Sequence, residues 1–289
     1  YVDSAVASAL NDVKQVRHVW DVNGKKWVAP AGEVFHKDFE RILKAVSVGM
    51  SVYLYGPAGT GKSYLAKQLA KALDVAYYET SSVSDEVQLK GFVNAMGKYQ
   101  ETPFYHAFKD GGVFLLDELD ASIPECVVML NNALANKEFT FPNDEHVVAS
   151  PDFHVVAAGN TLGRGNNAQY TARAALDMAS LNRFIKVKVD YSEEIELAQC
   201  NGDADLVGFI HSFREAVNKS GLDVLATYRD IKHIYQLFEV TGDMAFAMHS
   251  TIASDMSRED ADGIATATQC LGNRWWTGFS NMVHDKSQW

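Results

Sequence analysis

A glycine-rich segment of eight residues limits most strongly what this chain can fold into. Gly56–Ser63 reads Gly-Pro-Ala-Gly-Thr-Gly-Lys-Ser and follows the short apolar run Ser51–Tyr55. Leu65, Leu69 and Leu73 then recur at helical spacing, so the segment joins a predicted strand to a predicted helix. Glycines let successive backbone N–H groups point into one loop, and the helix N-terminus adds a positive dipole end. The pattern predicts a phosphate-binding loop.

The remaining strand signals indicate a parallel sheet with helices on both faces. Short apolar runs recur at Val75–Glu79, Val113–Asp117, Phe153–Ala158 and Phe184–Asp190, separated by helical stretches such as Ile123–Ala135. Near-continuous apolar strands that alternate with helices are typical of α/β folds. Beyond Asp190 the patterns are helical only, near residues 203–219, 228–240, 243–254 and 258–270. We therefore expect a P-loop α/β fold with flanking helices and a small C-terminal helical lid domain.

Two acidic residues follow one of the buried strands. Val113–Leu116 is apolar, and Asp117 and Glu118 come directly after it. In a P-loop protein the first acid and Ser63 hold Mg²⁺, Lys62 reaches the β- and γ-phosphates, and a following glutamate polarises a water molecule. The pair favours hydrolysis over phosphoryl transfer to a metabolite. The alternative is a strand that simply ends in a solvated acidic turn.

Composition excludes several classes of protein. Hydrophobic residues make up 47% of the 289 positions, which suits a packed core, and no apolar run reaches the roughly 18 residues that a membrane span needs. A net charge of −11 argues against a broad phosphate-gripping surface, so sequence-specific nucleic-acid binding is not expected. Cys126, Cys200 and Cys270 lie far apart without metal-ligand spacing. They predict reduced core residues in a cytoplasmic protein. The N-terminal residues show no basic region followed by an apolar run and a cleavage site, so we expect no export signal, and no membrane attachment is expected.

Several motifs together resemble the AAA+ ATPases. The P-loop, the Val113–Glu118 strand end and Asn160, which closes a further apolar strand, occur in that family's order. The segment from Lys90 through the acidic pair looks like the MoxR, CbbQ and CobS group, related to midasin and dynein modules, as does a predicted β-hairpin near 138–148. The run Leu181-Asn182-Arg183-Phe184 resembles the family's Leu-Asp-Arg-Phe box, with Asn182 in place of the usual aspartate.

The resemblance implies roles for three further residues. Asn160 would be sensor 1, which positions the attacking water, and Arg183 would be the arginine finger presented to a neighbouring subunit. Arg229 would be the sensor 2 arginine of the helical lid. We leave Asp120 and Glu79 as structural residues. The implied nucleotide-binding residues are Gly56, Pro57, Ala58, Gly59, Thr60, Gly61, Lys62, Ser63 and Tyr64.

Each of these roles has a plainer alternative. Asn160 could merely shape a turn, and Arg229 could be a helix-surface arginine. Arg183 could be a surface charge, with Arg173 as the finger instead.

Aromatic segments leave further alternatives open. Gly91–Tyr99 carries aromatics that could face a central pore, or it is a buried insert. Trp275, Trp276, Phe279 and Trp289 could dock on a neighbour, or pack back onto the lid. Phe35 and His36 could flank an adenine ring.

The residue patterns divide the chain into four parts, and the resemblance implies a leading function. We expect an N-terminal arm over 1–33, with a hairpin around Asn23-Gly24, a nucleotide-binding domain over 34–190, a helical lid over 191–270 and an aromatic tail over 271–289. The chain would hydrolyse Mg²⁺-ATP in a homo-oligomeric, hexameric ring that remodels a client protein. Partners in the resembling group often bear a von Willebrand A domain. The alternatives are a GTPase or DNA-processing subunit of the restriction type, or a nucleotide-gated assembly module with negligible turnover.

Overall fold

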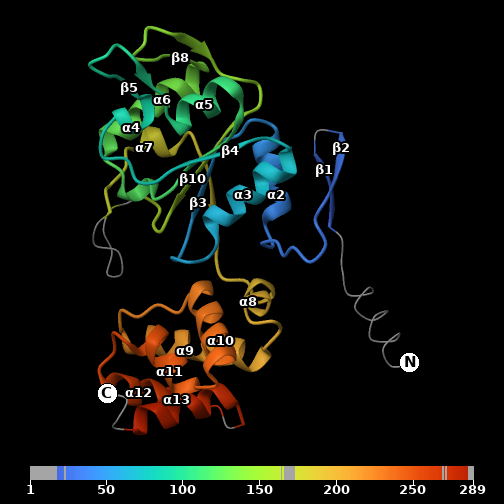
Figure 1. Ribbon diagram of the computed structural model, residues 1–289, viewed down its shortest axis with the longest axis vertical. Coiled ribbons are helices and arrows are strands. Elements are labelled where there is room, and N and C mark those ends of the chain that lie inside the picture. The colour runs from blue at the N-terminus through green and yellow to red at the C-terminus, as the bar shows by residue number, and fades with distance from the viewer. Residues whose placement is uncertain are drawn as a thin grey trace. The chain divides into compact units, whose positions relative to one another are not determined.

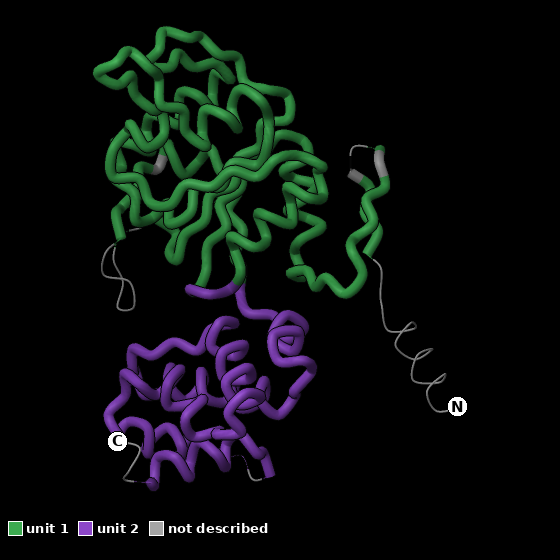
Figure 2. Tube along the Cα trace, in the orientation of Figure 1, with its two compact units in different colours: residues 1–57, 61–189 green, residues 58–60, 190–289 purple. Residues whose placement is uncertain are grey.

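The computed structural model describes residues 18–22, 24–163, 165, 173–268, 270 and 272–285. The chain divides into two compact units, shown in Figure 2. The first comprises residues 1–57 and 61–189, and the second comprises residues 58–60 and 190–289. Three residues of the glycine-rich loop are therefore grouped with the C-terminal unit.

The first unit is built on a five-stranded parallel sheet in the order β11-β3-β10-β7-β4. Figure 1 labels β3, β10 and β4 of this sheet. The strands are β3 Val52–Tyr55, β4 Tyr77–Thr80, β7 Gly112–Leu116, β10 Phe153–Gly159 and β11 Ile185–Lys188. Every residue of β7 and β10 is buried, because central strands of such a sheet are covered on both faces. The predicted α/β sheet with a helical C-terminal region is confirmed.

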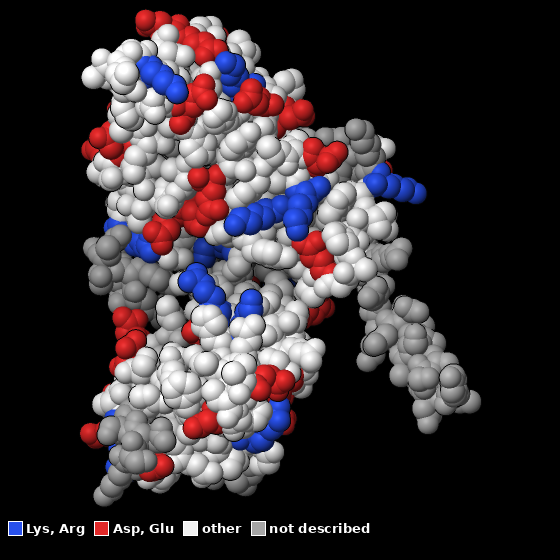
Figure 3. Space-filling model, in the orientation of Figure 1, with Lys and Arg blue, Asp and Glu red and all other residues white. Residues whose placement is uncertain are grey.

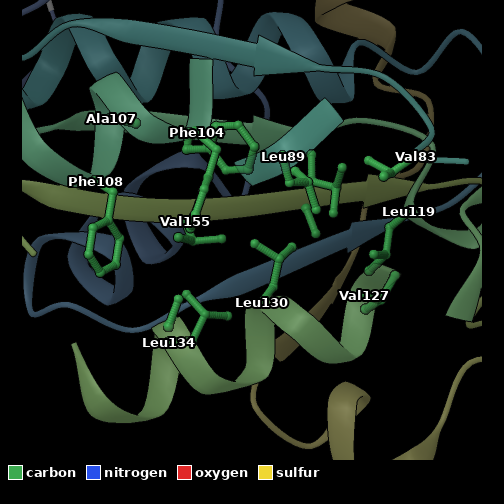
Figure 4. Packing of buried hydrophobic residues seen from close by; sticks show 14 of the residues in the cluster. Val83, Leu89, Phe104, Ala107, Phe108, Leu119, Val127, Leu130, Leu134 and Val155 are labelled. Atoms are coloured by element: carbon green, nitrogen blue, oxygen red, sulfur yellow. The ribbon is translucent and has the colours of Figure 1, made fainter. Parts of the chain in front are cut away.

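Alternate residues of the central strands enter two different cores. Val113 and Leu115 of β7 pack with α2 Phe39–Ser47 and α3 Lys62–Leu73. Phe114 and Leu116 point to the opposite face. There they pack with helices α4 Val87–Lys90, α5 Pro103–Asp110 and α6 Pro124–Asn136. Figure 4 shows this second core, with Phe104 and Phe108 of α5 and Leu130 and Leu134 of α6 around Val155 of β10. A short helix, α7 Met178–Leu181, precedes β11.

Among the described residues, three antiparallel hairpins accompany the sheet. They are β1 Val19–Val22 with β2 Lys25–Val28, β5 Phe92–Val93 with β6 Tyr99–Gln100, and β8 Glu138–Thr140 with β9 His146–Val148. The first and last were predicted from sequence. In the first, Trp20 pairs with Trp27, and their rings stack with centroids 5.4 Å apart.

The second unit is helical. Its elements are α8 Glu193–Gln199, α9 Ala204–Ser220, α10 Tyr228–Thr241, α11 Met244–Met248, the π-helical turn η2 His249–Ala253, α12 Arg258–Ala267 and α13 Arg274–His284. Trp275 and Phe279 are fully buried in its core. This burial supports packing of the aromatic C-terminal segment onto the helical unit, whereas Trp289 lies outside the described residues.

A strand start and a helix are among the features that differ from expectation. The strand predicted from Val75 begins at Tyr77, because Asp74 adopts a left-handed cap (φ 58°) and the Val75 N–H still donates to Ala70 of α3. The single helix expected over 243–254 comprises α11 followed by the π-helical turn η2. In the part of the chain that the structure describes, no helix has the length and apolar character needed to cross a bilayer.

Candidate functional site

Three neighbouring strands end at the same edge of the sheet, and each is followed by a predicted site residue. Strand β10 lies between β3 and β7, with Gly159 opposite Tyr55 and Ala157 opposite Leu116. The glycine-rich loop follows β3, Asp117 follows β7 and Asn160 follows β10. Ligand sites of open α/β sheets lie beyond the carboxyl ends of parallel strands.

The loop's conformation requires its glycines. Gly56 has φ 150°, and a Cβ there would lie 2.2 Å from the carbonyl oxygen of Val189. Gly61 is left-handed (φ 80°) and begins α3 without a side-chain cap. Helix N-terminal N–H groups that no side chain caps are suited to bind an anion.

Lys62 is held inside the loop. Its Nζ donates to the carbonyl oxygens of Gly56 at 2.8 Å and Pro57 at 2.7 Å, and to Asn160 Oδ1 at 3.2 Å. The residue is only 7% exposed. A buried ammonium needs such oxygen partners, so the loop and the end of β10 together fix the position of the cation.

Ser63 and Asp117 meet across the site. Ser63 Oγ donates to Asp117 Oδ2 at 2.6 Å, and Asp117 Oδ1 accepts from the backbone N–H of Glu118 at 2.8 Å. Glu118 itself is left-handed (φ 50°). Its side chain is 51% exposed, so one carboxylate is fixed beside the hydroxyl while the next reaches toward solvent.

Asp120 anchors the strand end that carries Asn160. It is fully buried, and its Oδ2 accepts from the backbone N–H groups of Asn160 at 3.0 Å and Thr161 at 2.8 Å. Tyr53 donates to the Thr161 carbonyl at 2.6 Å; burial, followed by the nearby charge of Asp120, raises the pKa of Tyr53 far above its usual value. Sequence reasoning treated Asp120 as structural and missed that it positions Asn160.

The three arginines have different surroundings. Arg173 Nη1 lies 3.2 Å from Asp120 Oδ1, and its Nη2 lies 3.8 Å from Glu118 Oε1. Arg183 follows α7 and is exposed. Arg229 is exposed near the start of α10, and its backbone N–H donates to the capping Thr227 Oγ1 at 3.2 Å.

The C-terminal unit also contacts the loop residues grouped with it. Tyr191 Oη donates to the Ala58 carbonyl at 2.9 Å, and the Arg214 guanidinium lies 3.7 Å from the centre of the Tyr191 ring. A Cβ on Gly59 would lie 2.4 Å from Thr227 Cβ. Sequence reasoning missed Tyr191; an aromatic residue just before the Ser192 helix start is its only local signal.

The structure also bears on the expectations for Phe35, His36 and Glu79. Phe35 and His36 are buried, and Phe35 packs edge-on to Trp27 at 5.8 Å, so the geometry does not favour an adenine contact. Glu79 accepts from Tyr77 Oη at 2.9 Å and faces Lys67, a structural arrangement.

The predicted insert 91–99 is partly exposed. Phe92 is exposed, whereas Tyr99 donates to the Lys90 carbonyl at 2.6 Å and packs against Tyr105. Beside it lies an apolar groove of about 500 Å³, whose lining includes Phe92, Val93, Phe139 and Phe141.

Comparison with known proteins bears on the segment that holds most of these residues. Residues 51–174 match the AAA domain (dynein-related subfamily). The match covers fewer than half of the residues, and Arg183 and Arg229 lie beyond it. Residues 51–174 are therefore similar to an AAA domain, and the parallel sheet with its flanking helices agrees with a P-loop α/β fold.

Curated relatives match about half of this chain. Uncharacterized proteins of Staphylococcus aureus strains USA300 and NCTC 8325 are each 31% identical over 153 residues, 49% of this chain and 56% of theirs. The chain thus spans about half the length of the curated relatives it matches. A crystal structure of NtrX from Brucella abortus is 12% identical, with a TM-score of 0.49 over 82% of this chain and 55% of that one. A structure of NtrX in complex with ATP is 13% identical, with a TM-score of 0.45 over 72% and 53%.

Proposed function

We propose that the protein hydrolyses ATP with Mg²⁺ as part of an AAA+ assembly. The observation that carries this proposal is the convergence of Lys62, Ser63, Asp117 and Asn160 at three adjacent strand ends. The Lys62 ammonium lies 3.2 Å from Asn160 Oδ1, and Ser63 Oγ lies 2.6 Å from Asp117 Oδ2. The side chains that we propose as ligands of phosphate, metal and water therefore lie close together.

The donor atoms suit Mg²⁺. A hydroxyl and a carboxylate are hard oxygen ligands, and Mg²⁺ typically takes one or two protein oxygens together with phosphates and waters. Among the described residues, no group of three or more His, Cys, Asp or Glu side chains could hold a metal by itself, which agrees with so sparse a protein ligand set. Ser63 and Asp117 would hold the ion, which when bound neutralises charge on the phosphate oxygens.

The remaining side chains suit attack by water. Lys62 would bind the β- and γ-phosphates, and Asn160 would position the water. Glu118, whose carboxylate reaches solvent, would accept the proton of that water as general base. Gly56–Ser63 and Tyr64 would surround the nucleotide, and Arg229 would contact its γ-phosphate from the helical unit.

Phosphate release by the purified full chain tests this proposal. We expect Mg²⁺-dependent turnover by the wild type and loss of turnover, with retained ATP binding, in Glu118→Gln. ATP binding without release by the wild type would favour the nucleotide-gated assembly module instead. A parallel assay with GTP tests which nucleotide is used. We expect ATP to be preferred, because the resembling GTP-using members carry an Asn-x-x-Asp stretch after the sensor strand, whereas Asn160-Thr161-Leu162-Gly163 lacks its aspartate.

We further propose that the chain works as a homo-oligomeric, hexameric ring of the MoxR type that remodels a client protein, with Arg183 acting on the neighbouring subunit's ATP. The exposed position of Arg183 and the exposed apolar groove beside Phe92 support contacts with other chains. Figure 3 shows both acidic and basic side chains on the face in view, and the net charge of −11 argues against sequence-specific nucleic-acid binding. The unpaired state of Cys126, Cys200 and Cys270 supports a reducing, cytoplasmic compartment.

Affinity capture tests the client proposal. Glu118→Gln, locked with ATP, should retain a partner that Lys62→Ala loses. Recovery of the same proteins by both variants would contradict ATP-dependent client binding.

A further inference from the structure

Arg173 joins two acids with different surroundings. Its Nη1 lies 3.2 Å from Asp120 Oδ1 and its Nη2 lies 3.8 Å from Glu118 Oε1. The arginine side chain is 12% exposed, Asp120 is fully buried and Glu118 is 51% exposed. The guanidinium is therefore paired with a buried carboxylate at its Asp120 end and reaches a half-exposed carboxylate at the other.

The Asp120 end is firmly held. Asp120 Oδ2 accepts from the backbone N–H groups of Asn160 and Thr161 and, at 2.8 Å, from Thr161 Oγ1. This leaves Oδ1 for Arg173. Buried charge pairs with additional hydrogen bonds hold their geometry well, and removing one partner leaves an uncompensated charge. Asp120 thus ties Arg173 to the strand end of Asn160.

The Glu118 end needs such a restraint. An exposed ion pair contributes little stability, and at 3.8 Å the contact is loose. Its consequence is positional, because a free glutamate side chain samples several rotamers. A guanidinium fixed by Asp120 limits those rotamers to the side of the site where Asn160 lies.

We propose that Arg173 is a positioning residue for Glu118 within the same subunit, an inference that rests on the proposed hydrolysis. Asp120 holds Arg173, and Arg173 holds the Glu118 carboxylate beside the sensor strand. This role differs from that of an arginine finger. Arg173 is committed to acids of its own chain, whereas within the described ranges no ion pair is formed by Arg183.

Steady-state kinetics of Arg173→Gln test the proposal. Misplacing a catalytic group by about 1 Å can lower the rate on the order of 10²-fold, so we expect kcat to fall by about 10²-fold while KM for ATP changes less than about twofold. Arg173→Lys should recover part of the loss. Arg41→Gln is the matched control, because the Arg41 side chain is 87% exposed, and it should keep wild-type kcat.

Loss of Arg173 also leaves Asp120 without its cation, so Arg173→Gln is accompanied by the double variant Asp120→Asn/Arg173→Gln. The double variant removes both charges and should fold, yet it should show the same loss of kcat. Wild-type turnover in the double variant would overturn the proposal. A wild-type protein that releases no phosphate would instead overturn the proposed function, and this inference with it.

Mixed assemblies distinguish a role of Arg173 within its own subunit from that of an arginine finger acting on a neighbouring subunit. Arg173→Gln chains mixed with Glu118→Gln chains should not regain activity, because every site then lacks either Glu118 or its own Arg173. Arg183→Ala chains mixed with Glu118→Gln chains serve as the positive control and should regain activity. Recovery in the Arg173 mixture would show that Arg173 acts on a neighbouring subunit and would overturn the proposal.

Discussion

Ser63 Oγ donates a 2.6 Å hydrogen bond to Asp117 Oδ2, joining the first turn of α3 to the end of β7. The two side chains are 54 residues apart in sequence. Each belongs to a segment that the neighbouring sequence is enough to predict, yet only the order of the strands brings the two side chains into contact. The contact aligns the two oxygen ligands that we propose for Mg²⁺.

Replacing Lys62 with alanine should abolish nucleotide binding. Lys62 supplies the cation inside a loop otherwise lined by backbone dipoles, and its Nζ is held by the carbonyls of Gly56 and Pro57. Calorimetric titration with ATP measures this, with Lys67→Ala, an exposed residue of the same helix, as the matched control. Equal ATP affinity in wild type and Lys62→Ala would contradict the phosphate-loop assignment.

Replacing Glu118 with glutamine should leave ATP affinity near that of the wild type and lower kcat by about 10²- to 10⁴-fold, the usual contribution of a general base. The amide keeps the shape of the side chain but cannot accept the proton of water. Phosphate release and ATP titration on the same preparation check both halves of this prediction. Undiminished turnover would exclude Glu118 as the base.

Replacing Arg183 with alanine should lower turnover by about 10³- to 10⁵-fold if its guanidinium completes a neighbouring site. Mixing Arg183→Ala with Glu118→Gln should then partly restore hydrolysis, because some interfaces pair an intact Glu118 with an intact arginine. Dilution below the concentration at which the chains assemble should lower specific activity, because a separate chain has no neighbour to supply Arg183. One-sided contacts of this kind close into a ring or continue as a helix. Unchanged specific activity at monomeric concentrations would refute the role in trans.

Replacing Trp275 with alanine should destabilise the helical unit by about 3–5 kcal/mol, the usual cost of truncating a large buried aromatic. Trp275 is fully buried, its Nε1 donates to Asp203 at 2.9 Å, and it packs edge-on to Phe238. Urea unfolding followed by circular dichroism measures the loss. Phe246→Ala, at an exposed position of α11, should cost less than about 1 kcal/mol.

His154 should make stability depend on pH. Burial lowers the pKa of this β10 side chain below its ordinary value of 6.5, so the unfolded chain binds a proton more readily than the folded one. The resulting stability is present above about pH 6.5 and declines as the pH falls toward the lowered folded pKa. Urea unfolding across this pH range should show that the free energy of unfolding depends less on pH in His154→Leu than in the wild type. An equal pH dependence in the two proteins would contradict the prediction.

Local sequence was enough to predict the glycine-rich loop, the acidic pair and the buried strands. Each depends on neighbouring residues: Gly56, Gly59 and Gly61 supply positive φ angles, and the apolar runs that became β7 and β10 needed burial on both faces. Boundaries were less predictable. Val75 has strand propensity, but its N–H completes the last turn of α3, and a backbone hydrogen bond outweighs a weak propensity.

The amino-acid sequence by itself determined which chemical groups the chain offers, since a loop, a strand end or a helix start is specified by residues within a few positions. Only the tertiary structure decided which groups share a site. Arg173 and Asp120 are 53 residues apart, and Tyr191 and Ala58 are 133 apart. No local pattern encodes such pairs, because their proximity follows from strand order and from how each compact unit buries its apolar faces.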